Sequence, residues 1–299
     1  MLPDKFYLPF DVTYAGVTRR MHRRCDDLRG DPAAWLRRLV AGFQVERDKW
    51  RREAALDDYW REGERLRLRL LWLVACAYLH ISYDLPRVIA DEWPRSPAPP
   101  DGFDEAEAEW LYFDLVGIFP DMLVEAGRDA DVLGWLAPVA RSAPRAALEV
   151  AGHWVLNLRS VAWIHARTLA ANPAGRRSRE DAILRAMVEA LKDVSNTRPW
   201  TGLVGPPNPP PARRATAPAV IPDPVVIGGA AAAALLGAAL TALLVAFRHR
   251  RGAERDDSLV LFVDQFGRRV YHYVRAAFEN PDRFDQYLAS VRGSLDPFG

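Results

Sequence analysis

Apolar side chains recur every three or four residues along much of this chain, which is the period of an amphipathic helix. Stretches at about 144–171 and 179–194 repeat it, and Asn172, Pro173 and Gly175 stop the first of them. No stretch alternates between apolar and polar residues over the length of a strand. The pattern predicts an all-α fold, a bundle of several helices. In residues 33–50, the face predicted to be buried consists of Trp35, Leu36, Leu39, Val40 and Phe43.

A continuous apolar run marks the centre of this bundle. Residues 70–79 read LLWLVACAYL, without a charged side chain, within a helix predicted over about 57–83. A helix that is apolar on all faces is covered on all faces, so we expect it in the middle of the bundle. Pro86 disfavours a helical conformation at Leu85 and predicts a turn or a new helix there.

The strongest signal is the stretch 225–247, VVIGGAAAAALLGAALTALLVAF, in which 23 consecutive residues carry no charge. As a helix that rises ~1.5 Å per residue it would reach roughly 34 Å, enough to cross a hydrocarbon core of ~30 Å. Prolines precede it and the basic run 248–251 follows it, as at a membrane interface. We expect a single transmembrane helix. A buried helix of a soluble domain is the alternative, which the Ala and Gly content favours.

Small residues recur at every fourth position of this stretch, at Gly229, Ala233, Gly237 and Thr241. Such a stripe lets two helix backbones approach closely in a membrane. It predicts a homodimer through the transmembrane helix, unless the Ala-rich and Gly-rich composition alone produces the spacing.

Composition divides the chain around this stretch. Nine prolines fall within residues 197–224, which predicts a linker of polyproline character. Beyond the stretch, an amphipathic pattern with Val270, Tyr273, Val274 and Phe278 on one side predicts short helices that lie on the membrane or on a partner. The predicted parts are a helical globular domain at 1–196, the Pro-rich linker at 197–224, the transmembrane helix at 225–247 and a charged, amphipathic C-terminal tail at 248–299.

The 299 residues are 49% hydrophobic and carry a formal net charge of +1. Of the 40 Lys and Arg, all but three are Arg, and acidic residues are interleaved with them, which argues against a nucleic-acid partner. The two cysteines, Cys25 and Cys76, form no Cys-x-x-Cys pair, and we expect both to be free thiols.

Two signals disagree on the orientation of the chain in a bacterial plasma membrane. Within about 20 residues of the predicted span, the C-terminal flank carries four arginines and the N-terminal flank two, which favours a cytoplasmic tail. The N-terminus, however, lacks the basic region and the continuous apolar run of a signal peptide. We expect a cytoplasmic N-terminal domain, because its export would need such a signal.

His80 and Asp84 lie one helical turn apart at the end of the apolar run. An imidazole and a carboxylate at this spacing can hold a divalent metal, or act as a general base with the group that orients it. His165, on the inward stripe of its helix, is the candidate third metal ligand. The structural alternatives are a buried histidine bonded to a backbone carbonyl with Asp84 as a helix N-cap, or an ion pair with Arg159 or Arg87. No cofactor is favoured over these alternatives.

Two segments carry a resemblance to a known family. Residues 77–93 read AYLHISYDLPRVIADEW, and residues 158–170 read LRSVAWIHARTLA. With their His-Ile-x-x-Asp-Leu and Arg-x-x-x-Trp patterns they resemble the bacterial domain-of-unknown-function family 5995, over about residues 10–195. The resemblance implies a helical fold and no established activity. It also implies one buried cluster of His80, Asp84, Arg159 and Trp163.

Two functions fit these observations. The first is a single-pass membrane protein whose helical domain acts on an unidentified protein partner as an interaction or accessory module. The alternative is a membrane-tethered enzyme, metal-dependent or hydrolytic, that uses His80 and Asp84, with Arg159 as a further catalytic candidate and His165 as a metal ligand. No phosphate-binding loop, His-Glu-x-x-His or Gly-x-Ser-x-Gly motif occurs in the sequence.

Overall fold

The computed structural model describes residues 4–50, 53–94, 103–114, 145–197, 200, 202–206 and 257–292. Their regular structure is helical, apart from one isolated antiparallel bridge between Leu66 and Val204. The predicted all-α bundle is confirmed for this part of the chain. None of the described helices has the length and apolar character needed to cross a membrane. The predicted span at 225–247 and most of the Pro-rich linker lie outside the described residues.

The helices of the first part of the chain are α1 (Asp4–Asp27), α2 (Gly30–Lys49), α3 (Asp57–Gly63), α4 (Arg69–Leu79) and α5 (Leu85–Asp91), with a π-helical turn (His80–Asp84) between the last two. Residues 105–114 form a further helix. The others are α8 (Arg145–Ala171), α9 (Arg176–Thr197), α11 (Asp257–Glu279) and α12 (Phe284–Val291).

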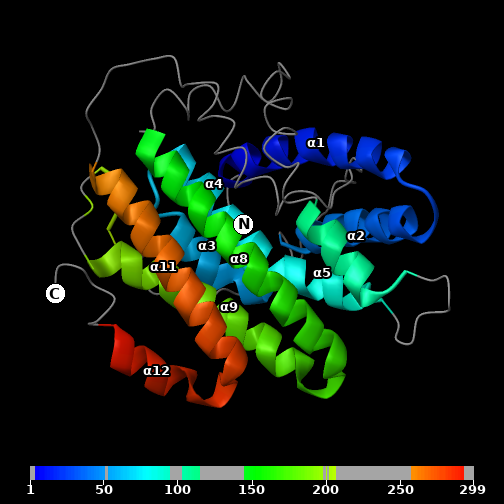
Figure 1. Ribbon diagram of the computed structural model, residues 1–299. Helices are drawn as coiled ribbons and strands as arrows, with labels where there is room; N and C mark the ends of the chain where they lie inside the picture. The colour runs from blue at the N-terminus through cyan, green and yellow to red at the C-terminus, as the bar shows by residue number, and fades with distance from the viewer. Residues whose placement is uncertain are drawn as a thin grey trace, which may run out of the picture.

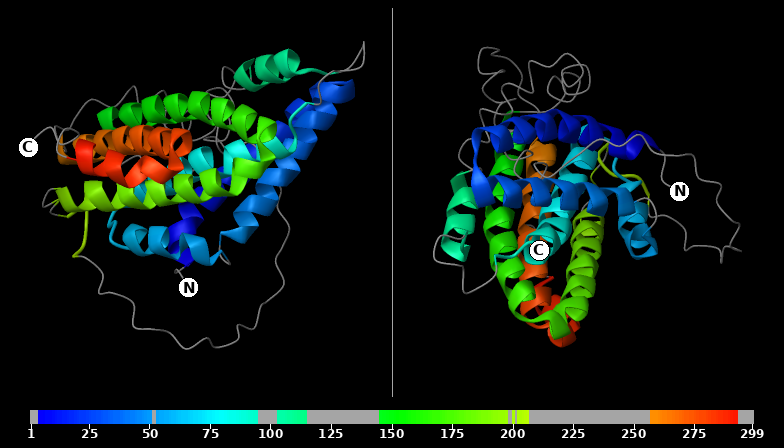
Figure 2. Two further views of the ribbon diagram at one scale, coloured as in Figure 1. Left: turned by 90° about the horizontal axis from the view of Figure 1, so that it is seen from below. Right: turned by 90° about the vertical axis from the view of Figure 1, so that its right-hand side faces the viewer.

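Three long helices form the main body of the bundle. Helix α11 lies between α8 and α9 and packs along both (Figure 1). Helices α1 and α2 run side by side across one side of this body (Figure 2). The segment from α4 through the π-helical turn to α5 packs against α8 on one side and against α1 and α2 on the other. This central segment is therefore covered from both sides, as its apolar sequence predicts.

The amphipathic faces agree with their predicted periods. In α2 the buried residues include all five of the predicted set, Trp35, Leu36, Leu39, Val40 and Phe43. In α9 the buried positions include Ile183, Leu184, Met187 and Leu191. A period of 3.6 residues is a local property, so it identifies a buried face before the partner helix is known.

The predicted central helix is interrupted at residues 64–68. The Arg67 N–H donates to the Leu203 carbonyl at 2.9 Å, and the Gly205 N–H donates to the Arg65 carbonyl at 2.7 Å. The Arg65 side chain is buried and binds Glu62 and Asn196. The backbone here pairs with a distant segment, so these groups do not form the helical ladder.

The chain stays helical into Pro86 by widening one turn. The Leu85 N–H donates to the His80 carbonyl, five residues earlier, which is the π-helical pattern. Pro86 has no N–H to donate, so the ordinary ladder would lose a bond at this point in any case. A new helix, α5, does begin here with Pro86 in its first turn. The predicted non-helical conformation at Leu85 is wrong, because its φ of −57° and ψ of −50° are helical.

Helix α11 belongs to the core of the bundle, whereas the sequence predicted short helices on a membrane or on a partner. It is one helix of 23 residues. Its predicted apolar side is buried, but α8 and α9 cover it. Residues 257–292 therefore complete the helical domain predicted at 1–196, and they do not form a separate tail. The buried apolar residues of α11 are Leu259, Phe262, Val263, Phe266, Val270, Tyr273, Val274, Ala277 and Phe278.

A glycine brings α11 close to α8. A Cβ atom built on Gly267 would lie 2.2 Å from Cγ of Trp154, so no other residue fits at this position without displacing the indole. The Trp154 Nε1–H donates to Asp264 Oδ1 at 3.0 Å, one helical turn from this glycine. Packing and a hydrogen bond thus fix the same stretch of the α8–α11 contact.

Polar contacts fix α11 and α12 against α9. The Tyr273 hydroxyl donates to Asp193 Oδ2 at 2.9 Å, and Arg292 Nε donates to the same oxygen at 2.8 Å. Arg269, 1% exposed, donates to Gln265 and to Thr197 at the end of α9. Apart from the bond to Gln265, these bonds join residues that are 72 to 99 positions apart in the sequence, so they contribute to one folded unit.

A chain that ends at residue 206 is expected to show no cooperative unfolding. Each fully buried Val, Leu or Phe side chain contributes roughly 1.5–3 kcal/mol, and α11 supplies seven of them. The free energy of unfolding of a whole domain is about 5–15 kcal/mol, so the loss exceeds what the rest can offset. Urea denaturation followed by circular dichroism measures the result.

The matched control retains α11 and α12 and replaces residues 207–256 by a Gly/Ser linker of equal length. We expect this chain to unfold in one transition near that of the full chain. Cooperative unfolding of the chain that ends at residue 206 would contradict the assignment of α11 to the core.

Candidate functional site

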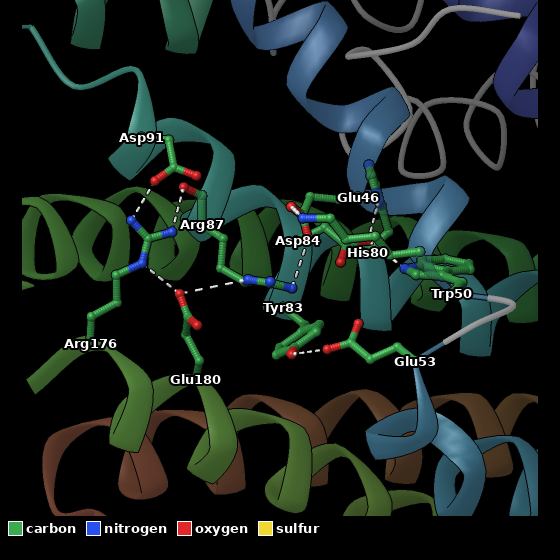
Figure 3. A network of polar contacts seen from close by, with 11 residues as sticks. Glu46, Trp50, Glu53, His80, Tyr83, Asp84, Arg87, Asp91, Arg176 and Glu180 are labelled. Carbon is green, nitrogen blue, oxygen red and sulfur yellow. Dashed lines mark hydrogen bonds and ion pairs between the residues drawn. The ribbon is translucent and has the colours of Figure 1, made fainter. Parts of the chain in front are cut away.

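His80 and Asp84 meet in the π-helical turn between α4 and α5 (Figure 3). His80 Nδ1 lies 2.8 Å from Asp84 Oδ2, so the two side chains share a face as their spacing predicts. Both residues are 0% exposed. Single π-helical turns occur often at functional sites, which makes this pair the first place to examine.

Trp50, the residue that follows α2, binds the same carboxylate. Its Nε1–H donates to Asp84 Oδ2 at 2.8 Å. One oxygen of Asp84 thus contacts both His80 and Trp50. The carboxylate joins the end of α2 to the central segment of the bundle.

Aromatic rings surround the imidazole of His80. Its ring centroid lies 5.2 Å from that of Phe43 on α2, 5.7 Å from that of Phe10 on α1 and 6.0 Å from that of Trp50. The pair is enclosed where α1, α2 and the π-helical turn meet. A substrate would have to displace one of these helices to reach it.

Asp84 does not act as the predicted helix cap. It occupies the N-cap position of α5, but its side chain makes no capping hydrogen bond. The hydrogen-bond partner that the structure gives His80 Nδ1 is the Asp84 carboxylate, where the structural alternative predicted a backbone carbonyl. The pair is buried, as the structural alternative predicted, but the two side chains bond to each other.

A chain of ion pairs next to this pair links α2, α5 and α9 (Figure 3). Arg87 Nη1 lies 2.8 Å from Glu46 Oε2, and Arg87 Nε lies 3.6 Å from Glu180 Oε1. Arg176 Nε donates to that Glu180 oxygen at 2.6 Å, and Arg176 also pairs with Asp91. Positive and negative groups alternate along this series of ion pairs, so α2, α5 and α9 are held to one another.

The pKa of Arg87 is raised above its ordinary value. Burial alone would lower this pKa, but Tyr83 and the carboxylates of Glu46, Asp84 and Glu180 outweigh burial. The guanidinium also lies over the Tyr83 ring, 4.5 Å from its centroid. Arg87 therefore remains charged, with Glu46 and Glu180 as its ion-pair partners.

His165 lies in another part of the bundle. Its ring stacks on Phe278 of α11, with centroids 3.7 Å apart and planes 14° apart. Burial and then the charge of Arg275 lower the pKa of His165 to about 3. Among the described residues, no three His, Cys, Asp or Glu side chains gather where they could hold a metal ion. The predicted metal site of His80, Asp84 and His165 is therefore not assembled, because His165 faces α11 while His80 faces α1 and α2.

Arg159 and Trp163 belong to a second aromatic cluster. The Arg159 guanidinium lies over the Tyr112 ring, 4.9 Å from its centroid, and the Tyr112 hydroxyl donates to the Arg159 carbonyl at 3.0 Å. Trp163 stacks on Tyr112 at 4.9 Å and lies 4.9 Å from Trp93. Burial lowers the pKa of Arg159. The four residues grouped by the resemblance are all buried. The rings next to His80 are those of Phe10, Phe43 and Trp50, whereas Trp163 packs against Tyr112 and Trp93 and Arg159 lies over Tyr112.

The polar residues missed at this site are Glu46, Trp50 and Glu180. Glu46 follows Phe43 by three positions, so it lies on the buried stripe of α2. Glu180 precedes Ile183 by three positions on the buried stripe of α9. A carboxylate on a buried stripe signals a buried partner, because an unpaired buried charge is costly. Trp50 has no such signal in the sequence.

Comparison of the chain with family models, with curated proteins and with solved structures gives no match. The resemblance to family 5995 therefore stays a prediction. The roles of the residues described above rest on their geometry alone.

Asp84→Ala is expected to lower the free energy of unfolding by about 3–5 kcal/mol. The change removes the buried oxygen that Trp50 and His80 share. The control is Asp91→Ala on the adjoining helix, where the carboxylate is 54% exposed and pairs with Arg176. We expect the control to cost at most about 1 kcal/mol. Urea denaturation of both variants measures the difference, and equal small losses would contradict a structural role for the pair.

Proposed function

We propose that this chain is a helical module attached to a membrane through residues 225–247, which acts through contacts with a protein partner. The long uncharged stretch supports the attachment. The fold supports an interaction or accessory role, because the candidate chemical groups serve packing. His80 and Asp84 are 0% exposed, and their enclosure by α1 and α2 favours a structural role over an enzymatic one.

The packing of α11 is the observation that supports a particular topology for this attachment. Residues 4–206 precede the apolar stretch and residues 257–292 follow it, yet their described parts build one core. A helix that crossed a membrane once would place these two parts on opposite sides. We therefore replace the single-pass prediction by a segment that enters and leaves the bilayer on the same face.

Exposed aromatic side chains support a protein partner. On the helix at 105–114, Trp110 is 66% exposed and Phe113 is 40% exposed, while Tyr112 between them faces the core. Large aromatic residues are enriched where proteins bind one another. A homodimer through Gly229, Ala233 and Gly237 remains a proposal from the sequence, because these residues lie outside the described part of the chain.

The arrangement also favours a cytoplasmic domain. With both flanks on one face, the arginines before and after 225–247 lie together, and the preference of arginine for the cytoplasmic side applies to both. The free cysteines Cys25 and Cys76 agree with a reducing compartment. The two orientation signals that disagree for a single crossing agree for a same-face attachment.

Cysteine labelling in bacterial membranes tests this topology. Arg177→Cys lies on α9, where the side chain is 80% exposed, and Asp282→Cys lies between α11 and α12 at an exposed position. We expect a membrane-impermeant maleimide to label both variants in inside-out vesicles and neither in intact spheroplasts. The native cysteines are buried, so unsubstituted chain is the background control.

Opposite labelling of the two positions would restore the single crossing and contradict the packing of α11. A second control replaces residues 225–247 by a Gly/Ser stretch of equal length, which should move the chain from the membrane pellet to the supernatant. If the unaltered chain is already in the supernatant of a detergent-free lysate, the attachment itself is overturned.

A further inference from the structure

A depression of about 390 Å³ opens between α8, α9 and α11. It lies around His165, on the side of α8 that faces α11, and it is separate from the His80–Asp84 pair. Its volume falls within the range of small-molecule sites, about 300–1,000 Å³. Helices α8 and α11 supply four lining residues each, and α9 supplies one.

Two arginines bring positive charge to the depression. Arg179 comes from α9 and Arg275 from α11. Arg275 Nε donates to Glu279 Oε1 at 2.9 Å, so its charge is largely balanced within α11. Arg179 lies over the Phe278 ring, 5.6 Å from its centroid, and its buried Nε has no hydrogen-bond partner among the described residues. The lining therefore holds one positive charge in excess.

His165 supplies an unused polar atom to the same place. The residue lines the depression and is 3% exposed, and its Nδ1 has no hydrogen-bond partner in the described part of the chain. Nearly all buried polar groups in folded proteins have a partner. The pKa of about 3 keeps the imidazole neutral at physiological pH, so it adds no charge to the lining.

Apart from Thr168 and Glu279, the remaining lining is aliphatic or aromatic. Val161 and Ile164 line it from α8, and the rings of Tyr271 and Phe278 line it from α11. Ile164 is 60% exposed at the rim. Apolar walls with a few polar groups are typical of sites for small organic molecules. A compact dianion such as phosphate fits less well, because it would leave the walls uncovered and would meet Glu279 with only one unbalanced guanidinium.

The geometry points to a binding site for a small organic carboxylate between α8, α9 and α11. The carboxylate lies beside Arg179, and the apolar body covers Ile164 and Phe278. This site is independent of the membrane attachment, and its ligand needs no contact with residues 225–247.

Saturation-transfer NMR on the purified full-length chain tests the site with benzoate as the probe. Benzamide has the same shape without the charge, and inorganic phosphate has the charge without the ring. We expect saturable benzoate binding, with benzamide and phosphate at least about tenfold weaker. Arg179→Gln should raise the Kd for benzoate about tenfold, because it removes a charge-assisted hydrogen bond. Arg177→Gln, on the same helix but 80% exposed and paired with Asp181, should leave the Kd unchanged.

A second pair of variants tests the site independently of Arg179, in case Arg179→Gln does not fold. Ile164→Glu places a carboxylate at the rim and should also raise the Kd for benzoate about tenfold by repulsion. Leu156→Glu is the same change two turns away on α8, at a position that is 50% exposed and outside the lining, and it should have no effect. The site is overturned if benzoate shows no saturable binding in the millimolar range, or if neither Arg179→Gln nor Ile164→Glu weakens it. Phosphate binding as tight as that of benzoate would overturn the assignment to a carboxylate.

Discussion

The packing of α11 between α8 and α9 is the interaction on which the rest of this structure depends. Nine apolar side chains of α11 are buried there, and Gly267 lets the helix approach Trp154 more closely than any residue with a Cβ would allow. Asp193 then holds Tyr273 and Arg292 through one oxygen, which fixes α11 and α12 along α9. Without α11 the inner sides of α8 and α9 would face water, and the buried polar groups of the central segment would lose the bundle that encloses them. The helical bundle formed by residues before 207 therefore depends on α11 for part of its core.

The same contact constrains what the apolar stretch at 225–247 can do. A bilayer separates the two ends of any segment that crosses it once, whereas a common core requires both ends on one side. The free energy of burying α11 is of the order of a domain's whole stability, and the proposed topology therefore keeps both ends of the stretch on the side of the core. In this proposal the conflict over orientation disappears as well, because arginines on both flanks would obey the positive-inside preference together.

Local periodicity predicts the faces of this fold but not their partners. The buried stripe of α2 follows from spacing alone, since helical geometry relates Trp35, Leu39 and Phe43 whatever covers them. The apolar side of α11 is visible in the same way, but nothing in its sequence distinguishes cover by α8 and α9 from cover by lipid. The break at 64–68 depends on hydrogen bonds to residues 203–205, which no local pattern contains. At the candidate site, spacing within one helix predicts that His80 meets Asp84, while Trp50 arrives there only through the tertiary fold.

The two groups of buried polar residues differ in what the fold leaves for a ligand. Around Asp84, one carboxylate oxygen contacts both Trp50 and His80, and the neighbouring arginines and carboxylates alternate in ion pairs. The other oxygen, Asp84 Oδ1, has no hydrogen-bond partner among the described residues. Such a network stabilises one arrangement of helices, and its His80–Asp84 pair is 0% exposed. Around His165 the surroundings are different, because His165 and Arg179, which also carry polar atoms without a described partner, line an open depression with mostly apolar walls. A ligand that contacts the Arg179 guanidinium at this depression would offset part of the cost of leaving polar groups unpaired, and this is where a partner of matching charge gains most.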